Sequence, residues 1–302
     1  YKDLATELSS LFKISENDRV GLMATRFYYS HAKAHELTKE IFYKNSILNA
    51  SEIISKNRFN KIGNYIQLGV GLNQDLTSQT IEANSMTLLP SLLFAYENLE
   101  DNVKKENYFD IINKYLQTFS KYIIRQDFSV RDFATFNPKM GNIIKEENYY
   151  GYSSSSCNSR NHSKAINGFT SAYISTGDPR FLSTAESLAD YFMNNLPQDY
   201  IPYYDFDDPN RNIPKDSSAA TIAVFALLDL SEVTKKEKYK IASYNILKSL
   251  STKYLSADLK NYQGIVMHGC DNKNGGYYTN SSLIYGDYYF IESLKKIKKE
   301  KN

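Results

Sequence analysis

The sequence predicts an all-α fold in which helices pair and the pairs stand side by side around a ring. Apolar residues recur with helical spacing along nearly the whole chain, and segments with strand periodicity are scarce. Strongly apolar segments alternate with amphipathic ones, and a polar turn separates the two members of each pair. Because such pairs place the apolar helix inside and the amphipathic helix outside, they predict an α/α toroid.

The first pair that the pattern defines covers residues 84–98 and 108–124. The first of these segments carries Leu89, Leu92 and Leu93 on or near one face and is apolar over most of its length. The second is amphipathic, and the polar segment 97–106 connects the two. This spacing predicts an inner helix followed by an outer one.

Two further pairs follow the same scheme. Residues 165–173 and 181–196 are separated by the sequence Thr-Gly-Asp-Pro at 176–179, which combines a helix-ending glycine with a helix-starting proline. Residues 218–230 and 239–255 are separated by a polar connector. The chain therefore repeats one architecture of helix, turn and helix.

Three connections are longer than helix hairpins usually need, at residues 128–156, 200–216 and 264–278. The segment 201–206 could be extended, but its proline and aspartate favour a loop. Long loops in compact domains often carry function, so we expect the functional site at the end of the ring where they lie.

Composition limits the classes of function. The 302 residues are treated as a single domain, 1–302, with 42% hydrophobic and 23% charged residues and a net charge of +2. This balance gives no support for a nucleic-acid partner, and no apolar run predicts membrane insertion. The chain starts at Tyr1, so an upstream segment is possible and the compartment, cytoplasmic or secreted, stays open.

Two other features of composition concern chemistry. There are 26 tyrosines and no tryptophan, and a tyrosine ring can pack its face while offering a hydroxyl, as sugar-binding clefts require. Cys157 and Cys270 could pair if the fold brings them together, which the sequence leaves open. No metal-ligand spacing or phosphate-binding glycine loop is present, so we expect neither a metal nor a cofactor.

Three ordered motifs resemble the unsaturated glucuronyl hydrolases of glycoside hydrolase family 88, which are related to family 105. Tyr-Tyr-Asp-Phe at 203–206, followed by Pro-Lys-Asp-Ser-Ser-Ala at 214–219, is similar to the family's Pro-Tyr-Trp-Asp-Phe and Pro-Arg-Asp-Ser-Ser-Ala. The helix pair around 176–182 is also similar, as are His-Gly-Cys at 268–270 and the segment 281–290. The resemblance covers roughly residues 151–297.

The resemblance implies an (α/α)6 barrel of six helical hairpins. Relatives carry a further helix or hairpin before the first aspartate, so the resemblance also leads us to expect that this N-terminal element is missing from the given sequence. It also implies an acidic oligosaccharide or polysaccharide partner and hydration-triggered release of a terminal 4,5-unsaturated uronate. In the family an aspartate protonates the vinyl ether carbon and activates a water. Such chemistry needs a carboxyl group between protonation states and cationic groups for the substrate carboxylate.

The chain departs from the family at both aspartates that matter most. The nearest match to the first places Arg19 there, and the second, which opens an apolar inner helix, corresponds to Asn84. A histidine that helps catalysis in the family falls near Asp132. In the segment that keeps Arg160, the family's second tryptophan is replaced by Lys164. Since an asparagine cannot exchange a proton as a carboxyl does, the catalytic groups must be rearranged or lost.

The candidate residues form two groups. Those with a possible catalytic role are an amide at the aspartate position, two imidazoles and one carboxyl: Asn84, His162, Asp205 and His268. Those with a possible substrate-binding role are cationic, acidic or phenolic: Arg19, Asp132, Tyr152, Arg160, Lys164, Tyr203, Tyr204, Lys215, Tyr277 and Tyr288.

Structural roles compete with several of these assignments. Asp216 is expected to cap the helix that follows it, and Asp205 could organise a turn instead of serving as an acid. Two other functions also stay open. One is a catalytically degenerate protein that binds an acidic glycan, and the other is a uronic-acid-modifying enzyme such as a C5-epimerase on the same barrel.

Overall fold

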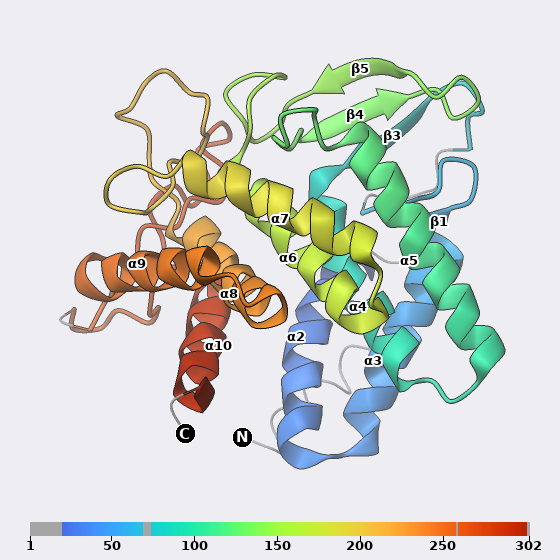
Figure 1. Cartoon of the computed structure of the whole chain (residues 1–302), viewed down its shortest axis with the longest axis horizontal. Helices are drawn as coiled ribbons and strands as arrows, with labels where there is room; N and C mark the ends of the chain where they lie inside the picture. Colours follow the sequence, from blue (N-terminus) through green and yellow to red (C-terminus); the bar gives the residue numbers. More distant parts are fainter. Residues whose placement is uncertain (1–19, 69–73, 258, 301–302) are drawn as a thin grey trace.

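The computed structural model describes residues 20–68, 74–257 and 259–300. Figure 1 shows helices arranged around a common centre, with a small sheet on one side. The α-helices of the described residues are α2 (Val20–Thr38), α3 (Ile41–Ile53), α4 (Leu89–Asn98), α5 (Asn102–Tyr122), α6 (Ser159–Thr176), α7 (Pro179–Asn194), α8 (Ser217–Thr234), α9 (Glu237–Lys253) and α10 (Ile284–Glu300). Two short helical segments, η1 (Ile54–Arg58) and η2 (Ala83–Leu88), extend α3 and precede α4.

The helices form the predicted pairs. Each inner helix packs against the outer helix that follows it, in the hairpins α2–α3, α4–α5, α6–α7 and α8–α9. The inner helices α2, α4, α6, α8 and α10 follow one another around the centre. The three pairs predicted from the sequence correspond to α4–α5, α6–α7 and α8–α9, so this part of the expectation is confirmed. The hairpin α2–α3 is an addition to the pairs that the pattern predicts.

The turn at 176–179 shows why these hairpins form where they do. Gly177 ends α6 with a φ of 73°, a left-handed conformation that glycine adopts without a Cβ clash. The Asp178 carboxylate then accepts a hydrogen bond from the Arg180 backbone N–H at 2.9 Å, and Pro179 occupies the first turn of α7. The end of one helix and the start of the next are thus encoded within three residues.

A small sheet corrects the expectation that 128–156 is a loop. Strands β3 (Gln79–Glu82), β4 (Phe133–Phe136) and β5 (Ile143–Glu147) pair antiparallel in that order. Buried and half-buried residues alternate in β4, so the strands do have a period of two, over too few residues to stand out in the sequence. A second pair, β1 (Phe59–Asn60) with β2 (Tyr65–Ile66), is shorter still.

The core lies between the inner and outer helices. α8 is buried along almost its whole length and packs against α6, α9 and α10. By length and composition α8 could also cross a membrane, with a mean hydropathy of 1.3, but 72% of it is buried inside the protein, as in a central core helix. Gly168 lets α6 approach η2, since a Cβ there would lie 2.2 Å from the Met86 sulfur.

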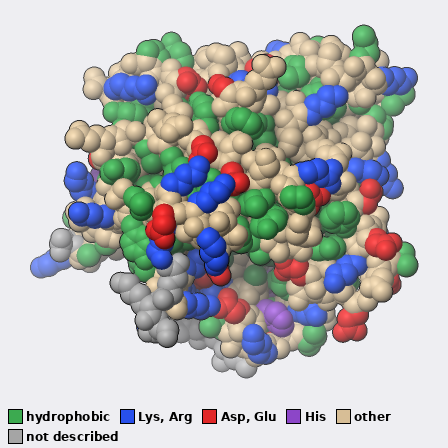
Figure 2. All heavy atoms as spheres, viewed as in Figure 1, with side chains coloured by type: hydrophobic (Ala, Val, Ile, Leu, Met, Phe, Trp, Pro, Cys, Tyr) green, Lys and Arg blue, Asp and Glu red, His purple; other side chains and the backbone are tan. Residues whose placement is uncertain are grey.

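Long side chains connect the first and last inner helices of the described residues. The Tyr29 and Tyr289 hydroxyls are 2.6 Å apart, and the Lys33 ammonium lies 3.0 Å from the Glu292 carboxylate. The described residues therefore supply five inner and four outer helices to the toroid. On the face in Figure 2, basic and acidic side chains are interspersed, as the near balance of charge predicts.

Candidate functional site

The first turns of α6, α8 and α10 meet at one end of the ring, together with η2 and the long loops. We call this end the loop-rich mouth. Isolated bridges tie the loops to one another there, between Asn158 and Asp205 and between Tyr203 and Lys215. The sequence predicted a site at the end of the ring that carries the long loops, and the polar cluster described below lies at that end.

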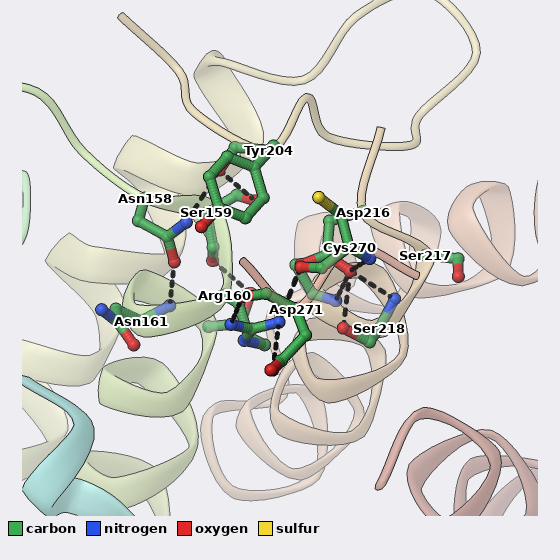
Figure 3. Close-up of polar contacts among 12 residues, drawn as sticks. Asn158, Ser159, Arg160, Asn161, Tyr204, Asp216, Ser217, Ser218, Cys270 and Asp271 are labelled. Atoms are coloured by element: carbon green, nitrogen blue, oxygen red, sulfur yellow. Dashed lines mark hydrogen bonds and ion pairs between the residues drawn. The ribbon is translucent and has the colours of Figure 1, made fainter. Parts of the chain in front are cut away.

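Arg160, in the first turn of α6, links three segments of this mouth (Figure 3). Its guanidinium donates to the Cys270 carbonyl at 2.7 Å, to the Tyr285 hydroxyl at 2.9 Å and to the Asp271 carbonyl. The side chain is 2% exposed and lies 3.7 Å from the Asp216 carboxylate. Of its donors only Nε is unpartnered within the described residues, so Arg160 acts first as a cross-link of the mouth.

Asp216 caps α8, which confirms the structural role expected for it. One carboxylate oxygen accepts hydrogen bonds from the backbone N–H groups of Ser218 at 3.0 Å, Ala219 at 3.3 Å and Cys270 at 3.2 Å. The other oxygen is buried and has no hydrogen-bond partner among the described residues, although it faces Arg160. The cap thus fixes the start of α8 and provides a counter-charge for the buried arginine.

Lys164 lies one helical turn after Arg160 and on the same face of α6. Its ammonium donates a hydrogen bond to the side-chain oxygen of Asn84 in η2. Burial and repulsion from Arg160 lower the pKa of Lys164 to about 7, although Asp271 and Asp216 partly offset them. The two positions that replaced an aromatic ring and a carboxyl in the family pattern are therefore in direct contact.

Glu82 supplies a carboxyl group at this mouth that the motifs did not indicate. It ends β3, two residues before Asn84, and is partly buried. Burial raises its pKa above the ordinary value, while the Leu68 backbone N–H and the charge of Lys164 act in the opposite direction. Asn84 is thus in contact with Lys164, whose pKa is lowered, and lies two residues after Glu82, whose pKa is raised. No motif marked Glu82, and only its residue type in an otherwise uncharged stretch could have drawn attention to it.

Asp132 organises the loop that follows β5. One carboxylate oxygen accepts hydrogen bonds from three consecutive backbone N–H groups, those of Tyr149, Tyr150 and Gly151, at 2.8–3.2 Å. The other accepts from the Asn161 side chain at 2.9 Å. Asp132 is 5% exposed, so it orders the site and leaves direct contact with a substrate to its neighbours.

Asp205 has a comparable role in the neighbouring loop. Its carboxylate accepts from the Tyr152 backbone N–H and the Ser156 hydroxyl, both at 2.7 Å, and from the Asp207 backbone N–H at 2.8 Å. It is 1% exposed. These contacts agree with the expectation that Asp205 organises a turn. Both carboxylate oxygens accept hydrogen bonds from the protein and do not face an open site.

His162 faces away from the cluster. Two residues along a helix turn the side chain by about 200°, so His162 and Lys164 lie on opposite faces of α6. Its Nε2 donates to the Leu188 carbonyl of α7 at 2.8 Å, and Tyr191 and Phe192 pack against the ring. Burial lowers the pKa of His162 to about 4, which keeps it neutral. The expectation that it shuttles protons is corrected to a packing role in the core.

His268 is exposed at the loop-rich mouth with a φ of 64°, and its ring packs edge-on against Tyr254. Its Nδ1 lies 2.5 Å from the Asn280 side-chain oxygen, and its backbone carbonyl accepts from the Ser217 N–H. The described contacts thus connect His268 to the loop 268–281 and to the start of α8. None of them connects it to Lys164.

The remaining candidates are spread over several environments. Tyr152 and Tyr277 are 54% and 62% exposed on loops, and Tyr204 is buried. Tyr203 lies under the cations of Arg211 and Lys215. Lys215 also pairs with Asp199. Tyr288 points into the interior of the ring near Tyr29.

Some expectations fall outside the site as described. Arg19 lies outside the described residues. Cys157 and Cys270 are both buried free thiols, so they do not pair. Over residues 20–68, 74–257 and 259–300, no three His, Cys, Asp or Glu side chains group as metal ligands.

The sequence is similar to those of known proteins. No family model matches the sequence. An unsaturated glucuronyl hydrolase of Formosa agariphila is 29% identical over 302 residues, which cover 98% of this chain and 74% of that protein. An unsaturated chondroitin disaccharide hydrolase of Streptococcus pneumoniae is 30% identical over 218 residues, 70% of this chain, and is matched over 54% of its own length.

A solved structure described as an unsaturated glucuronyl hydrolase specific for heparin superimposes with a TM-score of 0.84. It is 28% identical and covers 95% of this chain, which in turn covers 76% of it. This chain spans about half the length of the curated chondroitin disaccharide hydrolases it matches. Sequence and structure agree on the (α/α)6 barrel, and the chain is similar to unsaturated glucuronyl hydrolases over nearly its whole length.

Proposed function

We propose that the chain acts on acidic oligosaccharides and releases a terminal 4,5-unsaturated uronate after hydration of its double bond. The relatives are named for hydrolysis of unsaturated glucuronyl and chondroitin disaccharide substrates, which supports this substrate class. The Lys164 ammonium at the loop-rich mouth suits a negatively charged sugar, and Arg160 holds the surrounding segments in place. The N-terminal ends of α6, α8 and α10 add positive potential at the same place.

The reaction adds water across the double bond between C4 and C5 of the uronate. A proton goes to C4, and the oxygen of a water molecule bonds to C5 while the water gives a proton to a base. The resulting C5 hemiketal breaks its C5–O5 bond, which leaves a ketone at C5 and a hemiacetal at C1. The hemiacetal then breaks its bond to the glycosidic oxygen, which takes the hydroxyl proton, so C1 becomes an aldehyde and the rest of the oligosaccharide is released. The enzyme therefore needs one acid and one base close together, both usable near neutral pH.

One observation carries the assignment of these roles: Lys164 is in contact with Asn84, and Glu82 stands two residues from Asn84. With a pKa of about 7, the Lys164 ammonium can donate the proton to C4. The Glu82 carboxylate, whose pKa is raised by burial, is the base for the water. Asn84 orients the lysine, so the lost carboxyl at that position is replaced by two groups beside it.

The test follows the ultraviolet absorbance of the double bond during incubation with lyase-generated unsaturated disaccharides. We expect the band to disappear with the native chain, and Lys164→Met to slow its loss by about a thousandfold. Lys238→Met is the matched control and should leave the rate unchanged, because Lys238 is an exposed residue of α9 that pairs with Asp190 of α7. A band that is stable in the presence of the native chain contradicts the proposed reaction.

The two alternatives predict different outcomes in the same assay. A stable absorbance together with saturable binding of the disaccharide would identify a non-hydrolytic acidic-glycan binder. Uptake of deuterium at C5 when a saturated uronate glycan is incubated in heavy water would identify a C5-epimerase. The Arg160 guanidinium already donates to two backbone carbonyls and to Tyr285. It therefore supports the glycan-binding alternative less than an unbonded guanidinium would.

A further inference from the structure

A cavity of about 300 Å³ lies inside the ring, toward the end opposite the loop-rich mouth. All five inner helices of the described residues line it. Near its outer end are Glu97, Ser175, Asp229 and Lys296, which belong to the last two turns of α4, α6, α8 and α10. We call it the axial cavity. It is distinct from the cluster around Lys164 and Arg160, which lies at the first turns of the same helices.

Four tyrosines form much of the wall of the axial cavity: Tyr28 and Tyr29 from α2, and Tyr288 and Tyr289 from α10. Neighbouring rings meet at steep angles, between 55° and 82°. These neighbouring rings are therefore not parallel, and they do not form a site between two stacked rings. Burial raises the pKa of all four phenols, which keeps the hydroxyls neutral and able to donate.

Asn167, on α6, contributes an unused acceptor to this wall. It is 8% exposed, and its side-chain oxygen has no hydrogen-bond partner within the described residues. Its side-chain nitrogen lies 3.5 Å from the Tyr289 hydroxyl, which is bonded to Tyr29. A buried carbonyl oxygen without a donor is costly, so a ligand with a hydroxyl or N–H group at this point would satisfy it.

The charge of the axial cavity differs from that of the loop-rich mouth. Lys296 is paired with Asp229 and sits 3.8 Å from the centre of the Phe225 ring. Glu97 accepts a hydrogen bond from Ser175. Among the described residues, the lining therefore carries two carboxylates and one ammonium that is paired with one of them, which disfavours a second acidic sugar.

We propose that the axial cavity binds one ring of a neutral saccharide. Its volume is at the small end of ligand pockets, which suits a single ring better than a chain. Tilted phenols offer both ring faces and hydroxyls to a puckered, hydroxyl-bearing ring, and the Asn167 oxygen accepts from one of its hydroxyls. A planar nucleobase would need parallel rings to stack on, and a purely apolar ligand would leave Asn167 unsatisfied.

This proposal does not depend on the reaction at the loop-rich mouth. The probe is methyl β-D-galactoside, which has neither a carboxylate nor a double bond, and its binding is followed by ligand-observed saturation-transfer NMR and titration calorimetry. We expect saturable binding to the native chain. Asn167→Leu should weaken it by about tenfold through loss of the acceptor, and Ser171→Phe should abolish it by filling the cavity.

Two controls locate the site. Tyr244→Phe alters an exposed tyrosine of α9 and should leave affinity unchanged. Lys164→Met, which should stop turnover of the unsaturated disaccharide, should also leave the neutral probe bound. If the circular dichroism spectrum of Ser171→Phe differs from that of the native chain, that variant is misfolded, and the affinity of Asn167→Leu for the probe is the test of the site.

Three results would overturn the proposal. The first is absence of saturable binding to the folded native chain. The second is binding that survives Ser171→Phe or Asn167→Leu, or is lost in Lys164→Met, because the probe would then occupy the loop-rich mouth. The third is competition by a nucleoside that binds more tightly than any neutral sugar.

Discussion

The loop-rich mouth and the axial cavity are built on the same inner helices but differ in charge and chemistry. At the mouth, buried charged groups of both signs lie close together, with Arg160 and Lys164 one turn apart on α6 and the Asp216 carboxylate 3.7 Å from the guanidinium. In the axial cavity, neutral phenols and an amide line the wall, and Lys296 is paired with Asp229. A single helix, α6, thus carries cationic side chains in its first turns and the neutral Asn167 and Ser171 further along.

Helix direction explains part of this difference. The contacts among Arg160, Asp216 and Tyr285 show that α6, α8 and α10 start at the same end of the ring. The pair Asp229–Lys296 shows that α8 and α10 also end together. The N-terminal ends of helices favour anions and the C-terminal ends favour cations, so a parallel inner ring separates the two environments along its axis.

The largest expected effect is on stability at the mouth. Arg160→Ala leaves the buried Asp216 carboxylate without its counter-charge and should lower the free energy of unfolding by about 4 kcal/mol. Chemical denaturation measures this loss. Tyr288→Phe, a change in the axial cavity, should cost much less in the same experiment. Equal losses for the two variants would contradict the contrast between a charged and a neutral environment.

Lys164→Met should reduce turnover of unsaturated disaccharide by about a thousandfold, which the absorbance assay measures. Its effect on folding should be small because burial already disfavours the ammonium, whose pKa is lowered to about 7. A variant that kept the native rate would remove Lys164 from the proton-transfer step.

His162 makes the folded state sensitive to acid. Its folded pKa of about 4 lies below the ordinary value of 6.5, so between these values the unfolded chain binds the proton and the folded chain does not. Stability should therefore fall as pH falls from 6.5 to 4, by about 3 kcal/mol from this group. His162→Gln, which keeps a donor and cannot titrate, should have a flatter profile; an unchanged slope would contradict the assignment.

Glu82→Gln should slow turnover by about a hundredfold, because the amide keeps the shape of the side chain and loses the base. The pH dependence of the rate measures the same group in a second way. We expect Glu82 to set the acid limb, at a value above that of an ordinary glutamate because burial raises its pKa. A Glu82→Gln variant with an unchanged acid limb would assign that limb to another residue.

The helices of the second half were predictable because local rules decide them. The turn at 176–179 encodes a helix end and a helix start in three residues, and Asp216 caps α8 as expected. The small sheet was missed because β3 and β4 have four residues each, too few for alternation to be recognised.

The site was predicted less well, for reasons of geometry. Position within a motif suggested His162, although its spacing from Lys164 places it on the opposite face of α6. Asp205 and Asp132 carry the expected charge, but their carboxylates accept hydrogen bonds from backbone N–H groups of loops distant in sequence, so they order those loops. Glu82 reaches the site through strand pairing with β4, a contact between segments about fifty residues apart that no local pattern encodes.

The central claim is that the Lys164 ammonium donates the proton to C4. The most direct test is to add small primary amines to a Lys164→Ala variant and to measure whether activity returns. We predict that added amines restore loss of the double-bond absorbance, and that the alkaline limb of the rate moves from near pH 7 in the native chain to the pKa of the amine supplied. A Lys164→Ala variant with the native rate and the native pH profile, in the absence of any amine, would contradict it.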